Sequence, residues 1–216
     1  MIRHWLLAAA FATLAPNALA AEEAKPAAGA PDLARAQQIV SQVCAACHGA
    51  DGNSAASANP SLAGQPAQYI TLQLAHFKAG IRPSPIMQPM AAPLSDADMV
   101  SLGAFFGQQK AKPQTSKNPD SVKLAQQIFR GGDPKNDVPA CSACHVANGV
   151  GLPKNFPRLA GQHADYTYAQ LAAFKSGQRG NDKEGKDVNG RVMGAIAARL
   201  SDDQMKALAD YVAGLR

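Results

Sequence analysis

The four cysteines of this 216-residue chain all lie in two copies of one motif, Cys-Ala-Ala-Cys-His at 44–48 and Cys-Ser-Ala-Cys-His at 141–145. Two thiols three residues apart can each form a thioether with one vinyl group of a porphyrin, and the adjacent imidazole can then bind the iron. One copy alone could be a redox dithiol or half of a zinc site. Two copies that use every cysteine predict two covalently bound haem c groups. The attachment residues are Cys44, Cys47, Cys141 and Cys144, and the first iron ligands are His48 and His145.

The sixth coordination position decides whether a haem carries electrons or binds small molecules, because a thioether there closes the iron and raises its potential. Met87 and Met193 each lie seven residues before a Leu-Ser-Asp sequence, in segments rich in Pro and Gly that we expect to be loops. They are the predicted second ligands, with Met90 as the alternative to Met87. Met99 and Met205 also recur in register, but their helical spacing predicts core packing.

Two histidines of the expected mature chain lie outside the motifs, His76 and His163, and they offer the alternative of a second histidine ligand. Neither recurs in register, since they align with Ala173 and Pro66. We therefore expect methionine rather than histidine as the sixth ligand, and we expect both histidines to lie on the surface or in packed regions.

Three further pairs of residues recur around the motifs: Pro60 and Pro157, Arg82 and Arg179, and Tyr69 and Tyr166. A carbonyl near each proline, twelve residues after the histidine, could accept the proton of the imidazole nitrogen that does not bind iron. The arginines can bind a haem propionate through two parallel hydrogen bonds, and the tyrosines are further propionate partners. The alternatives are a solvated surface for the arginines and core packing for the tyrosines.

An internal repeat determines the predicted architecture. Residues 44–80 align with 141–177 without a gap, and 19 of these 37 positions are identical, including a Leu-Ala-Gly-Gln sequence in each copy. The second copy is longer by eight residues before this region and by nine after it. The chain is therefore a tandem duplication with two loop insertions.

The elements that must position the motifs are helical in both copies. We expect a first helix from Asp32 and its counterpart from Asp120, a middle helix over 66–79, and a last helix that begins with a capping sequence at Ser95 or Ser201. No run alternates as a strand would. The sequence predicts an all-α fold with a covalently bound haem at the centre of each small domain.

The division of the chain follows from composition. Residues 1–20 are typical of a secretory signal peptide and 21–30 of a flexible leader, so we expect a periplasmic protein without a transmembrane segment. The first domain is predicted at 31–110, a linker at 111–120 and the second domain at 121–216. Residues 21–113 carry no net charge and 114–216 carry net +4. This charge could steer an acidic partner, but it lacks the basic cluster that nucleic-acid binding needs.

The duplicated motif, the proline twelve residues later, the Leu-Ala-Gly-Gln sequence, the methionine and the final helix resemble the dihaem cytochrome c4 family over essentially the whole mature chain. The resemblance implies two class I cytochrome c domains with His/Met ligation of iron. It also implies haems close enough for fast electron exchange, and a carrier that delivers electrons in a respiratory chain to a terminal oxidase.

The leading hypothesis is thus an electron carrier without enzymatic turnover, whose partners are a donor such as a membrane cytochrome complex and an acceptor such as a terminal oxidase. Peripheral association with the membrane is compatible with this role. One alternative is the cytochrome subunit of a complex like flavocytochrome c sulfide dehydrogenase. Another is a dihaem peroxidase-like enzyme, which would need one copy without a methionine ligand.

Overall fold

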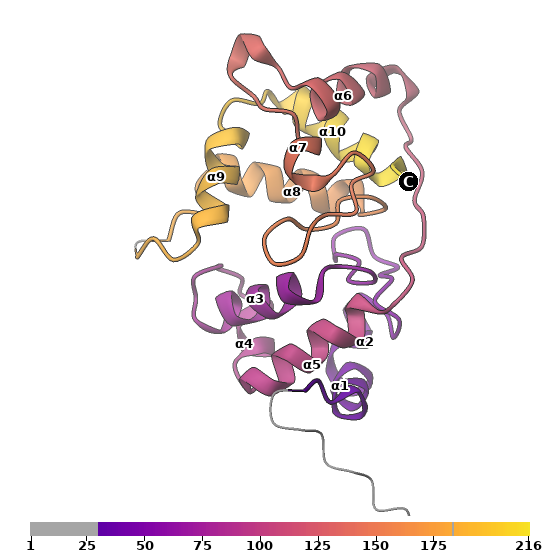
Figure 1. Cartoon of the computed structure of the whole chain (residues 1–216), viewed down its shortest axis with the longest axis vertical. Coiled ribbons are helices and arrows are strands. Elements are labelled where there is room, and N and C mark those ends of the chain that lie inside the picture. Colours follow the sequence, from indigo (N-terminus) through magenta and orange to yellow (C-terminus); the bar gives the residue numbers. More distant parts are fainter. Residues whose placement is uncertain (1–29, 183) are drawn as a thin grey trace, which may run out of the picture.

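A computed structural model of the chain describes residues 30–182 and 184–216, and it arranges them as two groups of helices, one stacked on the other (Figure 1). The first group holds α1 to α5 and the second α6 to α10. Within the described residues the structure has no strand, only two isolated bridges, Asp133 with Val138 and Leu152 with Phe156. The predicted all-α fold is confirmed. The expected signal peptide and nearly all of the leader lie outside the described residues.

The first group begins with one continuous helical segment that leads into the first motif. Asp32 caps α1 (Leu33–Ile39), which passes through a π-helical turn (Val40–Cys44) into α2 (Ala45–His48). The remaining helices of this group are α3 (Ala67–Lys78), α4 (Met87–Ala91) and α5 (Asp96–Gly107).

The second group repeats this order with one break. Its helices are α6 (Pro119–Gly131), a 3-10 turn (Pro134–Asn136), α7 (Ser142–His145), α8 (Ala164–Lys175), α9 (Val188–Ala197) and α10 (Asp202–Gly214). The inserted residues separate α6 from α7, because Gly132 adopts a φ of 76° and ends α6. The second motif therefore lies on a short helix of its own.

The last helix of each group is the centre of its core, as its apolar spacing predicts. In the first group α5 packs on α1 and α3, and in the second α10 packs on α6 and α8. Met99 and Met205 are each 3% exposed in these cores, which confirms their predicted packing role. Two separate apolar clusters result, one for each copy.

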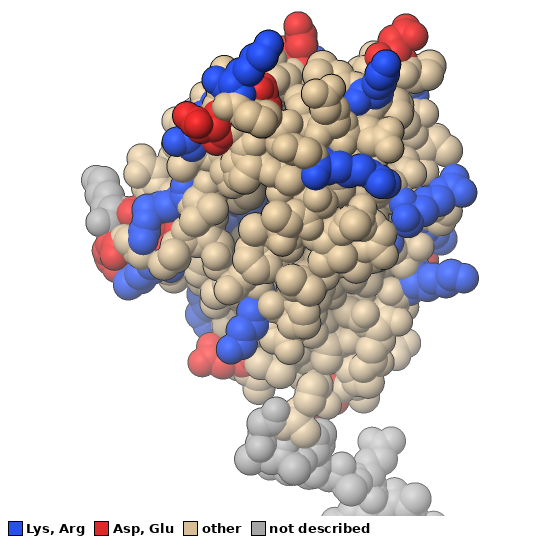
Figure 2. All heavy atoms as spheres, turned by 45° about the horizontal axis from the view of Figure 1, so that its top comes forward, with Lys and Arg blue, Asp and Glu red and all other residues tan. Residues whose placement is uncertain are grey.

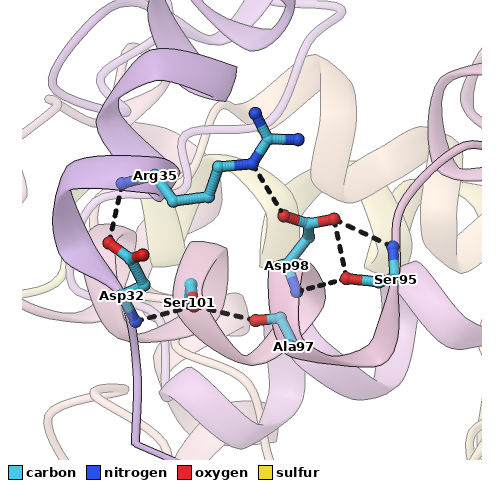
Figure 3. Close-up of polar contacts among 6 residues, drawn as sticks. All are labelled: Asp32, Arg35, Ser95, Ala97, Asp98 and Ser101. Carbon is cyan, nitrogen blue, oxygen red and sulfur yellow. Dashed lines mark hydrogen bonds and ion pairs between the residues drawn. The ribbon is translucent and has the colours of Figure 1, made fainter. Parts of the chain in front are cut away.

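Both predicted capping sequences form capping boxes. Ser95 Oγ accepts the amide of Asp98 at 3.1 Å, and the Asp98 carboxylate accepts the amide of Ser95 at 3.0 Å (Figure 3). The same carboxylate accepts from Arg35 Nε at 3.1 Å, and Ser101 Oγ accepts the amide of Asp32 at 2.9 Å. The N-terminal ends of α1 and α5 are thus joined, which places α1 and the motif after it against the core.

The segment between the groups is anchored at both ends rather than free, although its composition is that of a flexible linker. Asn53 in the first group binds the main chain of Lys110 at 3.0 Å and of Lys112 at 2.8 Å. Asp210 on α10 accepts the amides of Lys117 at 2.8 Å and Asn118 at 3.0 Å. In Figure 1 this segment runs along one edge of the molecule, past both groups.

The expectation that Met87 and Met193 lie in loops is wrong. Met87 is the first residue of α4, whose first turn is supported by Ser84 Oγ, the acceptor of the Met87 amide at 3.0 Å. Met193 lies inside α9, which Asp187 caps by accepting the amide of Gly190 at 2.8 Å. Proline at 89 is tolerated because it lies in the first turn of its helix.

None of the helices in the described part of the chain has both the length and the apolar character that a membrane span requires.

The crossing of α3 and α5 depends on Gly103. A Cβ atom there would lie 2.4 Å from the carbonyl oxygen of Ala67 and 2.6 Å from Thr71 Oγ1. We expect Gly103→Ala to lower the free energy of unfolding by about 1–3 kcal/mol, because the helices must move apart. Thermal unfolding of the haem-loaded protein measures this change.

The control is Gly131→Ala at the end of α6, where a Cβ would meet no atom within 4 Å. Alanine is the better helix former, so this variant should be as stable as the parent or more stable by up to about 1 kcal/mol. Equal stability losses in the two variants would contradict the close packing of α3 on α5.

Candidate haem sites

Each Cys-x-x-Cys-His motif forms one turn of helix, which holds its thiols and imidazole in a fixed relation. Cys44 and Cys141 are half-buried, Cys47 and Cys144 are exposed, and none of the four forms a disulfide. Burial raises the pKa of the Cys44 thiol, and it raises that of Cys141 to about 11. The thiols of Cys44 and Cys141 are therefore protonated at neutral pH, and no disulfide competes with thioether formation at any of the four cysteines.

Both histidines are buried and bound through one ring nitrogen. His48 Nδ1 donates to the carbonyl of Pro60 at 2.9 Å, and His145 Nδ1 donates to the carbonyl of Pro157 at 2.9 Å. Burial lowers the pKa of each histidine, and the hydrogen bond to the carbonyl only partly opposes this shift. Each ring is thus neutral, with Nε2 as the nitrogen left to bind a metal.

The chain turns sharply after each histidine through a residue with positive φ. This residue is Gly49 in the first copy, with a φ of 78°, and Val146 in the second, with φ 69° and ψ 153°. Glycine adopts this conformation freely, but a β-branched side chain there is strained. The second site accordingly holds local strain directly beside its histidine.

The methionines predicted as second ligands occupy comparable places in the two copies. Met87 and Met193 are both half-buried, on the short helices that precede α5 and α10. Met90 is more exposed, at 44%. Met87 and Met193 thus share the same degree of burial, whereas the side chain of Met90 is more open to solvent.

The predicted arginines and tyrosines meet in one cluster where the two groups of helices face each other. Arg82 donates across the interface to Tyr166 Oη at 2.9 Å and to Gln170 Oε1 at 2.8 Å. Arg179 donates in return to Tyr69 Oη at 2.9 Å and to Gln73 Oε1 at 3.1 Å. We call these residues the polar cluster: Tyr69, Gln73, Arg82, Tyr166, Gln170 and Arg179. The alternative that the arginines lie on a solvated surface is wrong, because both side chains are less than a tenth exposed.

The polar cluster concentrates positive charge in a buried place. Among the described residues, neither Arg82 nor Arg179 forms an ion pair with a carboxylate, and Arg179 Nε is buried without a hydrogen-bond partner. Burial alone would raise the pKa of Tyr166, but the charges of Arg82 and Arg179 outweigh it and lower that pKa. Buried charges are normally paired, so this cluster suits an anionic group such as a haem propionate.

His76 and His163, which lie outside the motifs, are both packed against the rest of the protein. His76 on α3 is 6% exposed. His163 lies at the start of α8, and its Nε2 donates across the interface to the carbonyl of Ser54 at 2.9 Å. Of the two roles expected for these histidines, surface or packing, both have the packing role.

Two pairs of glutamines at the interface were missed by the sequence analysis. Gln73 and Gln170 complete the polar cluster, and Gln65 and Gln162, from the Leu-Ala-Gly-Gln sequences, bind the main chain of the other copy. Their identity in register was the available signal. The alignment of the copies could not show that they face each other.

Both halves of the chain match models of cytochrome families. Residues 31–106 match the family described as cytochrome c oxidase, cbb3-type, subunit III, and residues 122–216 match the family described as cytochrome c. The matched segments contain one Cys-x-x-Cys-His motif each, which supports the assignment of one haem c to each half.

Similar proteins cover most of the chain. It is 41% identical over 183 residues to cytochrome c4 of Stutzerimonas stutzeri, covering 80% of this chain and 84% of that one. It is 39% identical over 175 residues to a thiosulfate dehydrogenase electron acceptor of the same species, strain A1501, covering 80% and 78%. The crystal structure of reduced recombinant cytochrome c4 from Pseudomonas stutzeri superimposes with a TM-score of 0.78 at 40% identity, covering 87% of this chain and all of that one.

The duplicated attachment motifs, the buried histidines bound through Nδ1, the all-α architecture and these similarities lead to one assignment. The chain belongs to the cytochrome c4 family, and it carries two haem c groups as an electron-transfer cytochrome.

Proposed function

We propose that the protein is a periplasmic two-electron carrier of a respiratory chain, exported by residues 1–20, which accepts electrons from a membrane cytochrome complex and delivers them to a terminal oxidase. The observation that carries this proposal is that the complete set of haem-binding residues occurs twice in register. Neither copy lacks a residue that would close its iron.

The proposed roles follow from the positions of the side chains. Cys44, Cys47 and His48 hold one haem with Met87 as the second axial ligand; the matching set of the second copy is Cys141, Cys144, His145 and Met193. When bound, each haem supplies a reversible Fe(II)/Fe(III) couple. A neutral imidazole held by a carbonyl favours a fixed ring orientation, and a thioether favours Fe(II), so these residues set a high potential.

A peroxidase-like enzyme would need an open iron in at least one copy. Met87 and Met193 occupy equivalent half-buried positions, so we propose that both irons are closed and that the protein does not turn over a substrate.

The proposed domains are 31–110 and 121–216, joined by 111–120, although α6 already begins at Pro119 within this segment.

A second candidate function is that of electron acceptor for a sulfur-compound dehydrogenase. The specific observation in its favour is the 39% identity to a thiosulfate dehydrogenase electron acceptor. A cytochrome subunit of a flavocytochrome c sulfide dehydrogenase-type complex would need the same haem sites. These functions differ in the donor, not in the chemistry of the chain.

The axial methionines can be tested by Met87→Ala and Met193→Ala. Each variant should open one iron to exogenous ligands and lower the potential of that haem by at least about 59 mV, a tenfold change for a one-electron couple. Visible spectra with and without added imidazole, together with redox titration, measure both effects. Met90→Ala is the matched control and should leave both haems unchanged. If this variant instead binds exogenous ligands at one iron, Met90 rather than Met87 is the axial ligand of the first haem.

The proposed propionate contacts can be tested by Arg82→Gln and Arg179→Gln. Loss of a buried cation beside a haem should favour Fe(III), so the reduction potential should fall. The free energy of unfolding should also fall by about 1–3 kcal/mol, because tyrosine and glutamine partners lose their donors. Redox titration and thermal unfolding measure the two effects. A stability loss with unchanged potentials would show that the arginines join the copies without touching a haem.

The choice of partner can be tested by stopped-flow mixing of the reduced protein with a terminal oxidase, and of the oxidised protein with a cytochrome complex or a thiosulfate dehydrogenase. The face shown in Figure 2 carries Lys and Arg side chains around a broad uncharged surface, and residues 114–216 carry net +4. We expect the partner that docks on the second copy to react more slowly as ionic strength rises. Equal salt sensitivity of donor and acceptor reactions would contradict separate docking ends, and fast reduction by the dehydrogenase alone would favour the second function.

A further inference from the structure

Gln65 and Gln162 each bind the main chain of the opposite copy through both the oxygen and the nitrogen of the side-chain amide. Gln162 accepts the amide of Ser61 at 2.9 Å through Oε1 and donates to the carbonyl of the same residue at 2.9 Å through Nε2. Gln65 accepts the amide of Arg158 at 3.0 Å and donates to its carbonyl at 2.7 Å. Each glutamine is 6% exposed. Each copy thus holds one residue of the other by both of its main-chain groups.

The residues held in this way directly follow the prolines that bind the histidines. The carbonyl of Pro60, which accepts from His48 Nδ1, and the amide of Ser61, which donates to Gln162, belong to the same peptide group. In the second copy the peptide between Pro157 and Arg158 has the same relation to His145 and Gln65. Each histidine is therefore joined through one peptide group to a glutamine of the opposite copy.

A planar peptide group transmits polarisation from its amide to its carbonyl. Donation by the amide increases the electron density on the carbonyl oxygen, because nitrogen and oxygen share the π system, and hydrogen bonds in such a chain strengthen each other. A stronger carbonyl acceptor draws the Nδ1 proton of the histidine and makes the ring a better donor to iron. A better donor stabilises Fe(III) relative to Fe(II).

We propose that Gln162 is a positioning residue for His48 and that Gln65 is one for His145, so that each copy tunes the potential of the haem in the other. This inference rests on the proposed roles of His48 and His145 as axial ligands. It assigns to the Leu-Ala-Gly-Gln sequence a function across the interface. Neither glutamine needs to touch a haem for this effect.

The test uses the full-length protein with both haems attached, and the variants Gln162→Met and Gln65→Met. Methionine keeps the length and volume of glutamine but removes both hydrogen bonds. We expect Gln162→Met to raise the potential of the haem at 44–48 and to leave that at 141–145 unchanged, and Gln65→Met to do the reverse. A redox titration followed by NMR measures each potential separately, because the ring N–H proton of each axial histidine reports its own haem. That proton should also shift in the affected copy.

His163→Ala is the matched control for a general loosening of the interface. It removes a cross-interface hydrogen bond of similar length, to Ser54, that does not involve the peptide after Pro60. We expect both potentials to stay at the parent values. A shift in this control as large as that in Gln162→Met would overturn the proposal.

Two further variants, Gln162→Glu and Gln65→Glu, distinguish an electronic effect on the histidine from a structural effect on the interface. They also replace the methionine variants if those fail to accumulate. Glutamate retains an oxygen acceptor for the amide, so the potential of the opposite haem should stay at or below the parent value. A rise would overturn the proposal, as would a shift confined to the variant's own copy, equal shifts of both haems or no shift in any variant. Failure of the proposed ligation would be visible earlier, as a parent protein whose spectra lack two low-spin haems with histidine ligands.

Discussion

The structure depends on a hydrogen bond between each buried histidine and the carbonyl twelve residues later. His48 is bound to Pro60 and His145 to Pro157, both at 2.9 Å, and these bonds fix which ring nitrogen is left for iron. The loops that carry the prolines lie outside the helices. They are held by main-chain bonds to Gly52 and Gly149, and by glutamines from the opposite copy. The orientation of each of these histidine rings thus depends on residues from both halves of the chain.

Duplication explains why the interface is reciprocal. Residues that recur in register meet across it in matched pairs, so Arg82 binds Tyr166 while Arg179 binds Tyr69. The apolar cores do not merge, and each last helix packs within its own copy. The copies are joined instead by buried polar contacts, which are directional and therefore fix one relative orientation. Two haems held in one orientation suit electron exchange within a molecule.

Much of this arrangement could be predicted from the sequence, because its signals are local. The capping boxes at Ser95 and Ser201, the helix start at Asp32 and the buried Met99 and Met205 follow from spacing and propensity. The helices that contain Met87 and Met193 could not be predicted from the sequence, because their Pro and Gly content favours loops. Their first turns depend on Ser84 and Asp187. The interface was also hidden, because an alignment identifies equivalent residues but not the faces that meet. Arg82 and Arg179 stood out as residues that recur in register, but their contacts with Tyr166 and Tyr69 of the opposite copy were not foreseen.

The two copies form one unit through the peptides that hold the histidines. Native-state hydrogen exchange of the Ser61 and Arg158 amides tests it most directly, because both amides lie outside the helices and donate only to glutamines of the other copy. We predict that both amides are protected and exchange with the same opening free energy, that of separating the copies. Exchange of either amide at the rate of an unprotected loop would show that the two copies do not form one unit through these peptides.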